Sequence, residues 1–553
     1  MKRIVIETAA VMSVVALAAC SEKTIDTVSP PVSVPETADV SVFNITTEGY
    51  ASDDPDFDGL FRLELAAKDA VGLFIVHADG SVEVLRMVLE SDGSWNIALN
   101  DDDVITWTEG DRYFAYYPQD SKIDAASVNL QATSEEEFFA DVIAGWTVAA
   151  DQSEDFEVSS LLTASGVYNP DGGTGKPSID ICLSPKTALV CFVPECTTYV
   201  FDNTPAIPDY NNPLQVDFDG IDPFNDGGRY FYKTNPADGT GFSGTAGGEK
   251  WSQSISGVGP GEVVVIPVGR ASEIHHTLQP GDFFLSDGNL LSRDADAADV
   301  SSADVIGMVT NIDPDRIGQA AKDALGGVVH GTVTSTRENS VYAWYGTQGN
   351  DSRDESSIGL EVLASVESTP EENLEILDAD VDGYGYTSAI FSKRAKDVAS
   401  GKYPLFRSAQ LFSNVVGGPE ANAVTTGWYV PAMGELMDFF RTACGMSLTS
   451  SDGTFGGELN DIWMWWTGTG VDIAAAINSS MSKVSMDDKT FLDDSDLYTR
   501  FYWTSSVSAD NLALTLYFYA LYEDTAPEEN LMLRSSYKSA ADGGALSRLV
   551  LVF

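Results

Sequence analysis

The chain has 553 residues, of which 43% are hydrophobic and 10% aromatic, so it is long enough to bury several cores. It carries 84 acidic residues and only 31 basic ones, which gives a formal net charge of −53. The acidic residues are spread along the whole chain, which argues against binding to nucleic acid or to an anionic lipid surface. The charge fits a surface-exposed protein. The 48 glycines and 23 prolines indicate many turns, and therefore a mostly β protein.

The N-terminal segment has the pattern of an export signal. A basic start and an apolar run lead to Leu17-Ala18-Ala19-Cys20, a sequence typical of bacterial lipoproteins. It predicts a signal peptide over residues 1–19 and a lipid anchor, with palmitate on Cys20, that holds the protein at the outer membrane. An ordinary cleaved signal peptide is the alternative. The polar, proline-rich residues 20–38 are expected to form a tether.

Four further cysteines are Cys182, Cys191, Cys196 and Cys444. None of them shows the C-x-x-C spacing of a zinc or redox site. Export permits disulfides, but pairing depends on a geometry that the sequence does not give. These cysteines are therefore buried thiols, or they include at most one structural bridge.

From residue 39 onward the pattern predicts strands separated by turns. Ala70–His77 is an apolar run, and Tyr113–Pro118 combines aromatic residues with a strand-ending proline. The order VGLFIV, ITW, GDRYFAYYPQD and SSLLTASG is similar to that of the first domain of the fimbrillin family of pilus proteins. Phe114–Pro118 is the most specific part of this resemblance, which implies a β-sandwich over residues 39–170.

A second β region follows. The segment Ile179–Val193 resembles the paired strands that open the second fimbrillin domain, and Val263–Val268 has the pattern of a closing strand. Fimbrillins often have a histidine near the position of Pro185, and this chain has none there. The resemblance implies a second β-sandwich over residues 171–279.

The third region contains GDFFLSDG, IGMV, GWYVPAMGEL, YWTSS and SRLVLVF, in that order. These motifs resemble the module called the fibrobacter major paralogous domain and related C-type-lectin-like modules. The resemblance implies an α+β domain over residues 280–553. The expected fold class is therefore mostly β with α+β, comprising two fimbrillin-like sandwiches followed by a lectin-like domain.

Within this third region, Gly427–Leu436 predicts the end of a strand, a turn at Pro431 and the start of a helix. Glu435 near the helix start is favoured there by the helix dipole. No nucleophile or base accompanies the turn, and none of the four histidines lies in a catalytic motif. The sequence therefore predicts no catalytic site, and the segment is expected to be a packing element around Trp428.

One acidic segment matches part of a calcium loop. Asp378, Asp380 and Asp382 occupy the first, third and fifth positions of D-x-D-x-D-G, but the twelfth position is Ala389 where such loops have glutamate. Residues 54–59 share the same opening. These residues are either a Ca²⁺ site or acidic turns of the kind that so acidic a chain produces by chance.

Three tryptophans, Trp463, Trp465 and Trp466, are candidates for a binding surface. They could stack on sugar rings or contact a protein partner, since tryptophan is enriched at binding hot spots. The alternative is a small local core. The Glu-Pro-Asn or Gln-Pro-Asp triplet of calcium-dependent lectins is missing from the chain, so a lectin-like fold need not imply lectin activity.

The family resemblance implies a lipid-anchored fimbrial subunit at the cell surface, an adhesive tip or accessory pilin that assembles with other pilin subunits by strand exchange. Its ligand would be a glycan or protein on a host or bacterial surface. Fimbrillin precursors are cut after a basic residue, and Arg62 is the candidate because no Lys or Arg lies between Lys23 and Arg62. The segment Leu546–Phe553 is expected to be an internal strand. The alternative function is a monomeric surface lipoprotein that binds glycans.

Overall fold

The computed structural model describes most of the chain after residue 36. The described residues are 37–40, 42–97, 105–119, 123–172, 176–236, 240–346, 353–363, 365–458, 461–466, 472–492, 500–521, 528–539 and 545–553. They form two compact units, one of residues 37–194 and 216–269 and one of residues 195–215 and 270–553. The predicted signal peptide and Cys20 lie outside the described residues. Within the described part, no helix combines the length and the apolar content that crossing a bilayer requires.

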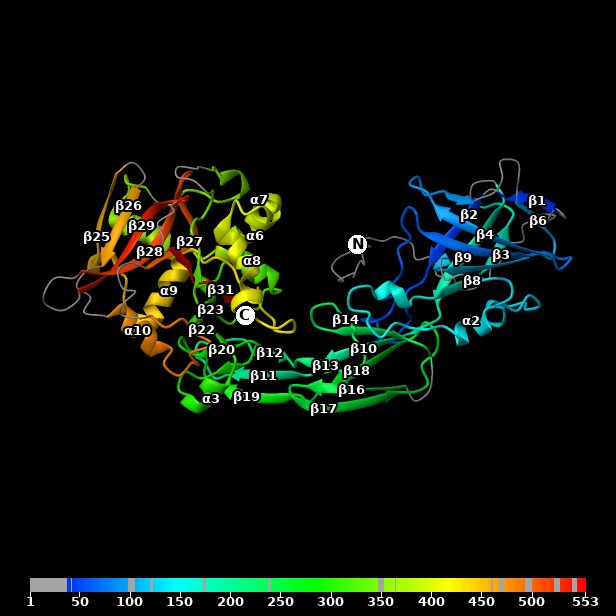
Figure 1. Ribbon diagram of the computed structural model, residues 1–553, viewed down its shortest axis with the longest axis horizontal. Coiled ribbons are helices and arrows are strands. Elements are labelled where there is room, and N and C mark those ends of the chain that lie inside the picture. Colours follow the sequence, from blue (N-terminus) through cyan, green and yellow to red (C-terminus); the bar gives the residue numbers. More distant parts are fainter. Residues whose placement is uncertain are drawn as a thin grey trace. The chain divides into compact units, whose positions relative to one another are not determined.

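A seven-stranded sheet is the main element of the first unit (Figure 1). In sheet order its strands are β2 (Val42–Thr47), β9 (Ser178–Pro185), β8 (Leu162–Asn169), β7 (Arg112–Tyr117), β3 (Ala70–Val76), β4 (Val82–Leu89) and β5 (Trp95–Ile97). Neighbouring residues of β3 face different cores, because Leu73 packs in one hydrophobic cluster and Phe74 in another. The apolar run at β3 is therefore a strand covered on both faces.

Short elements cover this sheet. They are β1 (Thr37–Val40), β6 (Ile105–Thr108), α1 (Glu135–Phe138), α2 (Ala140–Ala144) and the 3-10 turn η2 (Phe156–Ser159). β1 and β6 form a two-stranded antiparallel sheet, and Val40 and Trp107 pack into the same core as Leu73. On the other face, the ring of Phe138 in α1 stacks on Phe114 at 4.0 Å. The aromatic residues of the motif at 114–118 thus hold the helices on the sheet.

Two smaller sheets complete the first unit. One is ordered β14 (Phe224–Asn225), β15 (Tyr230–Thr234), β10 (Ala188–Pro194) and β18 (Val263–Val268), and the other is ordered β13 (Val216–Phe218), β16 (Thr240–Ala246) and β17 (Glu249–Ile255). Phe192 of the first sheet contacts the rings of Phe218, Phe242 and Trp251 of the second, with centroids 4.9–5.8 Å apart. The two sheets therefore pack face to face, as in a β-sandwich.

The compact units divide the chain differently from the predicted boundaries. The boundary at residue 170 assigns β9 to the second sandwich, whereas β9 pairs with β8 and β2 in the first sheet. Residues 195–215 and 270–279 lie inside the predicted range 171–279 but belong to the second unit. An apolar pattern identifies a strand without identifying its partner, which explains the difference.

Three sheets form the β part of the second unit. The first is ordered β12 (Tyr210–Pro213), β11 (Cys196–Phe201) and β19 (Ser272–His276). The second is ordered β21 (Leu290–Leu291), β20 (Phe283–Leu285), β22 (Val305–Asn311), β23 (Thr332–Ser335) and β31 (Val550–Val552). The third is ordered β24 (Asn339–Ser340), β30 (Ala545–Ser547), β27 (Arg500–Ala509), β28 (Leu512–Leu521), β29 (Glu528–Tyr537), β26 (Asp461–Trp466) and β25 (Thr454–Glu458).

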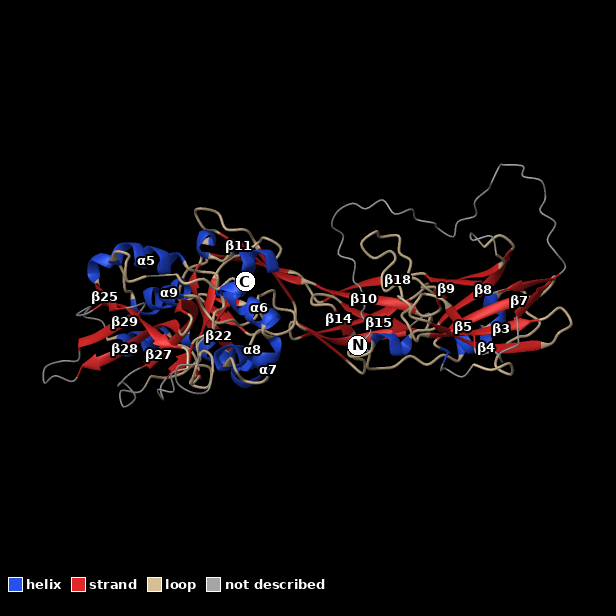
Figure 2. Ribbon diagram, turned by 90° about the horizontal axis from the view of Figure 1, so that it is seen from above, coloured by secondary structure: helices blue, strands red, loops and turns tan. Residues whose placement is uncertain are grey.

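Most of the helical ribbon of the protein belongs to this second unit (Figure 2). Its helices and turns are α3 (Ala297–Ser302), η3 (Pro314–Arg316), α4 (Gln319–Ala324), η4 (Ser356–Ile358), α5 (Pro370–Ala379), α6 (Gly383–Lys393), α7 (Ala395–Ala399), α8 (Pro404–Val416), α9 (Met433–Cys444), η5 (Ser450–Asp452) and α10 (Ile473–Ser480). α9 is the most buried of the long helices, and its Leu436 and Phe440 pack with Leu514 and Phe518 of β28. The unit therefore combines α and β elements around shared cores.

The three predicted motifs of this unit meet at the start of α9. Tyr429 exchanges backbone hydrogen bonds of 2.8 and 3.1 Å with Val550, and the Ser505 N–H donates to the Pro431 carbonyl at 2.8 Å. The strand expected over the last residues is divided, because β30 belongs to the seven-stranded sheet and β31 to the five-stranded one. Arg548 and Leu549 make the connection between them.

Two of the cysteines, Cys191 and Cys196, are free thiols and are not bridged to each other. Cys191 is fully buried, and this burial raises the pKa of its thiol to about 12. It acts as a core residue rather than as a reactive thiol, because the thiolate is the reactive form.

The packing of Trp428 generates a stability prediction. Its indole is 7% exposed, donates to the Gly417 carbonyl at 3.3 Å and meets Phe412 of α8 edge-on at 5.6 Å. We expect Trp428→Ala to lower the free energy of unfolding of the second unit by roughly 3–5 kcal/mol, through lost contacts and a cavity. Phe491→Ala is the control, because Phe491 is 52% exposed. Chemical denaturation that finds the two variants equally stable would contradict the packing role of Trp428.

Candidate functional site

The first candidate site is the edge strand β2 and the segment that follows it. β2 pairs in parallel with β9, from Val42 opposite Ser178 to Thr47 opposite Leu183. Phe43 buries its ring in the sheet core, while the exposed Asn44 donates to the Asp180 carboxylate at 2.7 Å. β2 thus contributes one face to the core, and its outer edge carries no strand partner within the described sheet.

The chain after β2 is anchored in a second place. The Tyr50 hydroxyl is hydrogen-bonded to Thr187 at 2.6 Å, and burial raises the pKa of this phenol. The ring of Phe61 lies 4.6 Å from both Phe156 and Phe231. Phe61 has a backbone φ of +51°, in the left-handed region, so the chain turns sharply where its ring enters the aromatic cluster.

Arg62 directly follows this anchor. Its side chain is exposed, and residues 62–66 belong to no helix, strand or turn. The next residue is held through its backbone, because the Thr47 hydroxyl donates to the Leu63 carbonyl at 2.5 Å. An exposed basic residue in irregular backbone has the accessibility that a protease requires.

The second candidate site is the terminal strand β31. It pairs antiparallel with β23, and every residue from Leu549 to Phe553 is at most 1% exposed. The carbonyl of Phe553 accepts from the His330 N–H at 2.7 Å, and its ring stacks on the His330 imidazole at 5.7 Å. Removal of β31 would open the cores on both of its faces, since its residues alternate between two clusters.

A buried ion pair fixes the chain just before β31. Arg548 is fully buried, its guanidinium forms an ion pair with Glu338, and it donates to the Ser335 carbonyl at 2.8 Å. Glu338 also pairs with Arg500 at 2.5 Å. The Arg548 guanidinium lies 4.7 Å over the ring of Phe439 in α9. The sequence analysis did not identify this pair, although an arginine directly before the apolar run LVLVF was a usable signal.

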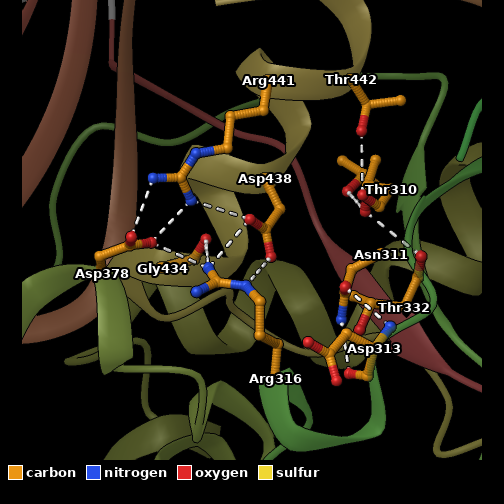
Figure 3. A network of polar contacts seen from close by, with 11 residues as sticks. Thr310, Asn311, Asp313, Arg316, Thr332, Asp378, Gly434, Asp438, Arg441 and Thr442 are labelled. Atoms are coloured by element: carbon orange, nitrogen blue, oxygen red, sulfur yellow. Dashed lines mark hydrogen bonds and ion pairs between the residues drawn. The ribbon is translucent and has the colours of Figure 1, made fainter. Parts of the chain in front are cut away.

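The structure places Asp378 in an ion-pair network instead of an open loop (Figure 3). Its carboxylate accepts from Arg316 at 2.9 Å and from Arg441 at 2.6 and 2.9 Å. Asp438 of α9 binds the same two arginines at 2.9–3.0 Å. Two carboxylates and two guanidinium groups balance each other here, which ties η3, α5 and α9 together.

Asp380 and Asp382 have different surroundings. Asp380 accepts hydrogen bonds from Ser506 and from Tyr386, the latter at 2.9 Å. One oxygen of Asp382, Oδ1, is buried without a hydrogen-bond partner among the described residues. Burial raises the pKa of both carboxyl groups. Across the described residues, no group of three or more His, Cys, Asp or Glu is arranged to hold a metal ion, so the Ca²⁺ site stays a prediction without geometric support.

Glu435 closes the turn that the sequence singled out. Its carboxylate accepts from the Tyr429 hydroxyl at 2.6 Å and from the Ala432 N–H at 2.7 Å. The second contact satisfies a free N–H at the start of α9. Gly383 passes so close that an added Cβ would lie 2.4 Å from Glu435 Oε2. Glu435 is therefore a buried structural acid, with its pKa raised well above the ordinary value by burial.

Strand alternation separates the three tryptophans of β26. Trp466 points into the core, is 1% exposed and donates to the Thr449 carbonyl at 3.0 Å. Trp463 and Trp465 lie on the opposite side, half-buried, with rings 5.7 Å apart. Trp463 also packs over Gly456 of β25, where an added Cβ would meet the indole at 2.0 Å. The candidate binding surface therefore narrows to Trp463 and Trp465.

Comparison with known proteins identifies fimbrial relatives. No family model matches the chain. A Bacteroides ovatus protein, provisionally named fimbrium tip subunit Fim1C, is 24% identical over 493 residues, which cover 80% of this chain and 86% of that protein.

The crystal structure of a fimbrial protein from Bacteroides ovatus is similar in fold, with a TM-score of 0.58 and 19% identity, over 93% of this chain and all of that one. A protein of Bacteroides uniformis, provisionally named a cell adhesion protein, reaches a TM-score of only 0.25 with 12% identity, over 43% of this chain and 95% of that one. This score is too low to show a shared fold. The chain thus has the fold of a known fimbrial protein over nearly its whole length. The relatives' names support the resemblance to the fimbrillin family.

Glu435 leads to a pH prediction. Because its pKa is raised in the folded state, the folded chain retains a proton that the unfolded chain releases. The contribution of Glu435 to stability is complete below the ordinary glutamate pKa and is lost as pH rises toward the folded pKa. Each pH unit in that interval costs about 1.4 kcal/mol. We expect Glu435→Gln to flatten this decline, so that the variant gains stability relative to the parent as pH rises above the ordinary glutamate pKa.

Denaturant unfolding at a series of pH values measures this effect. Glu371→Gln is the matched control, because Glu371 lies exposed in the first turn of α5. A parent and a Glu435→Gln variant with parallel pH profiles would show that Glu435 does not hold a proton in the fold.

Proposed function

We propose that this protein is a lipid-anchored fimbrial subunit, an adhesive tip or accessory pilin that other pilin subunits join by strand exchange. The relative named a fimbrium tip subunit and the fimbrial protein of similar fold support this role. A surface location follows from the same relationship. The lipoprotein pattern at Cys20 supports anchoring at the outer membrane, and we propose a binding role without catalysis.

The observation that carries the proposal is the contrast between β2 and β31. β31 is buried on both faces and is preceded by the Arg548–Glu338 ion pair, so the protein cannot donate it without opening its C-terminal cores. β2 also lies at the end of its sheet, but it buries only one face and precedes an exposed, irregular segment at Arg62. A subunit with a fixed last strand and a removable first strand accepts a neighbour's strand and ends a fibre.

Strand acceptance has a direct physical basis at β9. Cleavage after Arg62 would detach β1 and β2 from the body of the first unit. The backbone groups of β9 that now pair with β2 would become available, and so would the sites of Val40 and Phe43 in the core. A strand from another subunit, with apolar residues at alternating positions, would restore both sets of contacts.

The C-terminal unit is proposed as the adhesive part, in keeping with its resemblance to C-type-lectin-like modules. A glycan-binding lipoprotein that acts as a monomer is the second candidate, favoured by the half-buried Trp463 and Trp465 on the outer side of β26. Recovery of the protein in purified fibres separates the two candidates, because a monomeric receptor would not copurify with them.

Cleavage at Arg62 is tested by Arg62→Ala. We expect the variant to retain its N-terminal strands at the cell surface and its incorporation into fimbriae to fall at least roughly tenfold, because β9 remains occupied. N-terminal sequencing of the surface protein and immunogold labelling of sheared fibres provide the two readouts. Lys68→Asn is the matched control, since Lys68 is an exposed basic residue six positions further on, and its φ of +83° suits asparagine.

Two outcomes would contradict the proposal. Parent protein in fibres that still begins at Cys20 would exclude cleavage as a requirement for assembly. Labelling spread evenly along the fibres would assign the protein to the stalk rather than to the tip.

A further inference from the structure

A pocket lined by cations stands out in this acidic chain. It has a volume of about 410 Å³ and is lined by Arg353, Ser392, Lys393, Arg394, Ala395, Lys396 and Asp397, at the junction of α6 and α7. Four of these seven residues are basic, whereas basic residues number only 31 among the 553 of the chain.

The two arginines of the pocket are held in position by a buried carboxylate. The Glu355 side chain is fully buried and accepts from Arg394 at 2.9–3.0 Å, and it lies 3.5 Å from Arg353. The Tyr403 hydroxyl donates to the same carboxylate. Arg394 also donates to the Ser357 hydroxyl at 3.3 Å, so two side chains fix the orientation of its guanidinium, and its Nη1 group keeps a set geometry. The pocket therefore has a prearranged part.

The two lysines supply charge that the protein does not neutralise. Lys393 and Lys396 are exposed, and neither forms an ion pair with a carboxylate of the described chain. The one carboxylate in the lining, Asp397, is shared between Lys402 at 2.9 Å and Arg353 at 3.4 Å. Asp397 and Glu355 together offset two of the cations, so the pocket keeps an excess of positive charge.

We infer that this pocket binds a short acidic saccharide through its carboxylate or sulfate group. A net charge of −53 repels extended polyanions such as nucleic acid at long range, while a single anionic sugar within the roughly 8 Å screening length meets mainly the local cations. The volume suits a ligand of a few rings rather than a polymer surface. The inference rests on the proposed adhesive function only for the role of the ligand in the cell. Binding of the saccharide can be measured on the isolated protein.

Isothermal titration of the whole exported chain tests the inference. The probes are sialyllactose for a carboxylate, sulfated lactose for a sulfate, lactose as the neutral saccharide and inorganic phosphate as a simple anion. We expect at least one charged saccharide to bind, and its affinity to fall as salt is raised, while lactose and phosphate bind at least roughly tenfold more weakly.

The variant Lys393→Glu/Lys396→Glu should weaken that binding by roughly tenfold or more, because charge-assisted hydrogen bonds are lost and repulsion is gained. Lys176→Glu/Lys250→Glu changes the net charge equally at exposed lysines of the first unit and should leave binding unchanged. Equal melting temperatures for the two double variants show that both are folded.

Three results would overturn the inference: no binding of either charged saccharide, binding that survives in Lys393→Glu/Lys396→Glu, or phosphate binding as tight as that of the saccharide. Fibre incorporation of the same variant separates this failure from failure of the fimbrial role. A subunit that enters fibres but binds no acidic saccharide keeps the proposed function and loses only the ligand.

Discussion

The buried ion pair between Arg548 and Glu338 is the contact on which the C-terminal architecture depends. Loss of Glu338 would leave the fully buried Arg548 without its carboxylate, and an uncompensated buried charge of this kind typically costs about 3–5 kcal/mol. Arg548 lies where the chain leaves the seven-stranded sheet and enters the five-stranded one, and its guanidinium covers Phe439 of α9. One residue therefore couples two sheets and the central helix, and it fixes β31 within the fold.

The N-terminal end has the opposite character. β2 and β31 both lie at the end of a sheet, but β2 buries only one face, whereas β31 is buried on both. The segment from Tyr50 to Phe61 is held by side chains that enter an aromatic cluster rather than by a continuous ladder. Release of this part would cost edge contacts and a few buried rings, whereas release of β31 would cost two cores. This difference is the basis of the proposal that the first strand is exchanged and the last is kept, as in a subunit that ends a fibre.

The sequence predicted the positions of several strands well, but it predicted poorly which strands pair with each other. The apolar run at β3, the aromatic strand β7 and the start of α9 were predicted where they occur, because periodicity and proline mark such elements. The sequence did not predict the pairing of β9 with β2 or the division of the terminal strand at Arg548, because strand pairing depends on contacts between residues distant in sequence. Asp378 illustrates the same limit, because its Arg316 and Arg441 partners lie 62 and 63 residues away. In the basic pocket, Lys393, Arg394 and Lys396 are already close in the sequence, and only Arg353 and Glu355 are brought to them by the fold.

Two disulfide locks test most directly which strand is exchanged. Asn44→Cys/Asp180→Cys joins facing residues of β2 and β9, and Thr334→Cys/Val550→Cys joins facing residues of β23 and β31. We expect the first lock to abolish incorporation into fimbriae until reductant is added, while Asn44→Ser/Asp180→Ser and the second lock assemble normally. Assembly that persists with β2 locked would show that β2 is not exchanged. Assembly that stops when β31 is locked and resumes with reductant would show that β31 is exchanged instead.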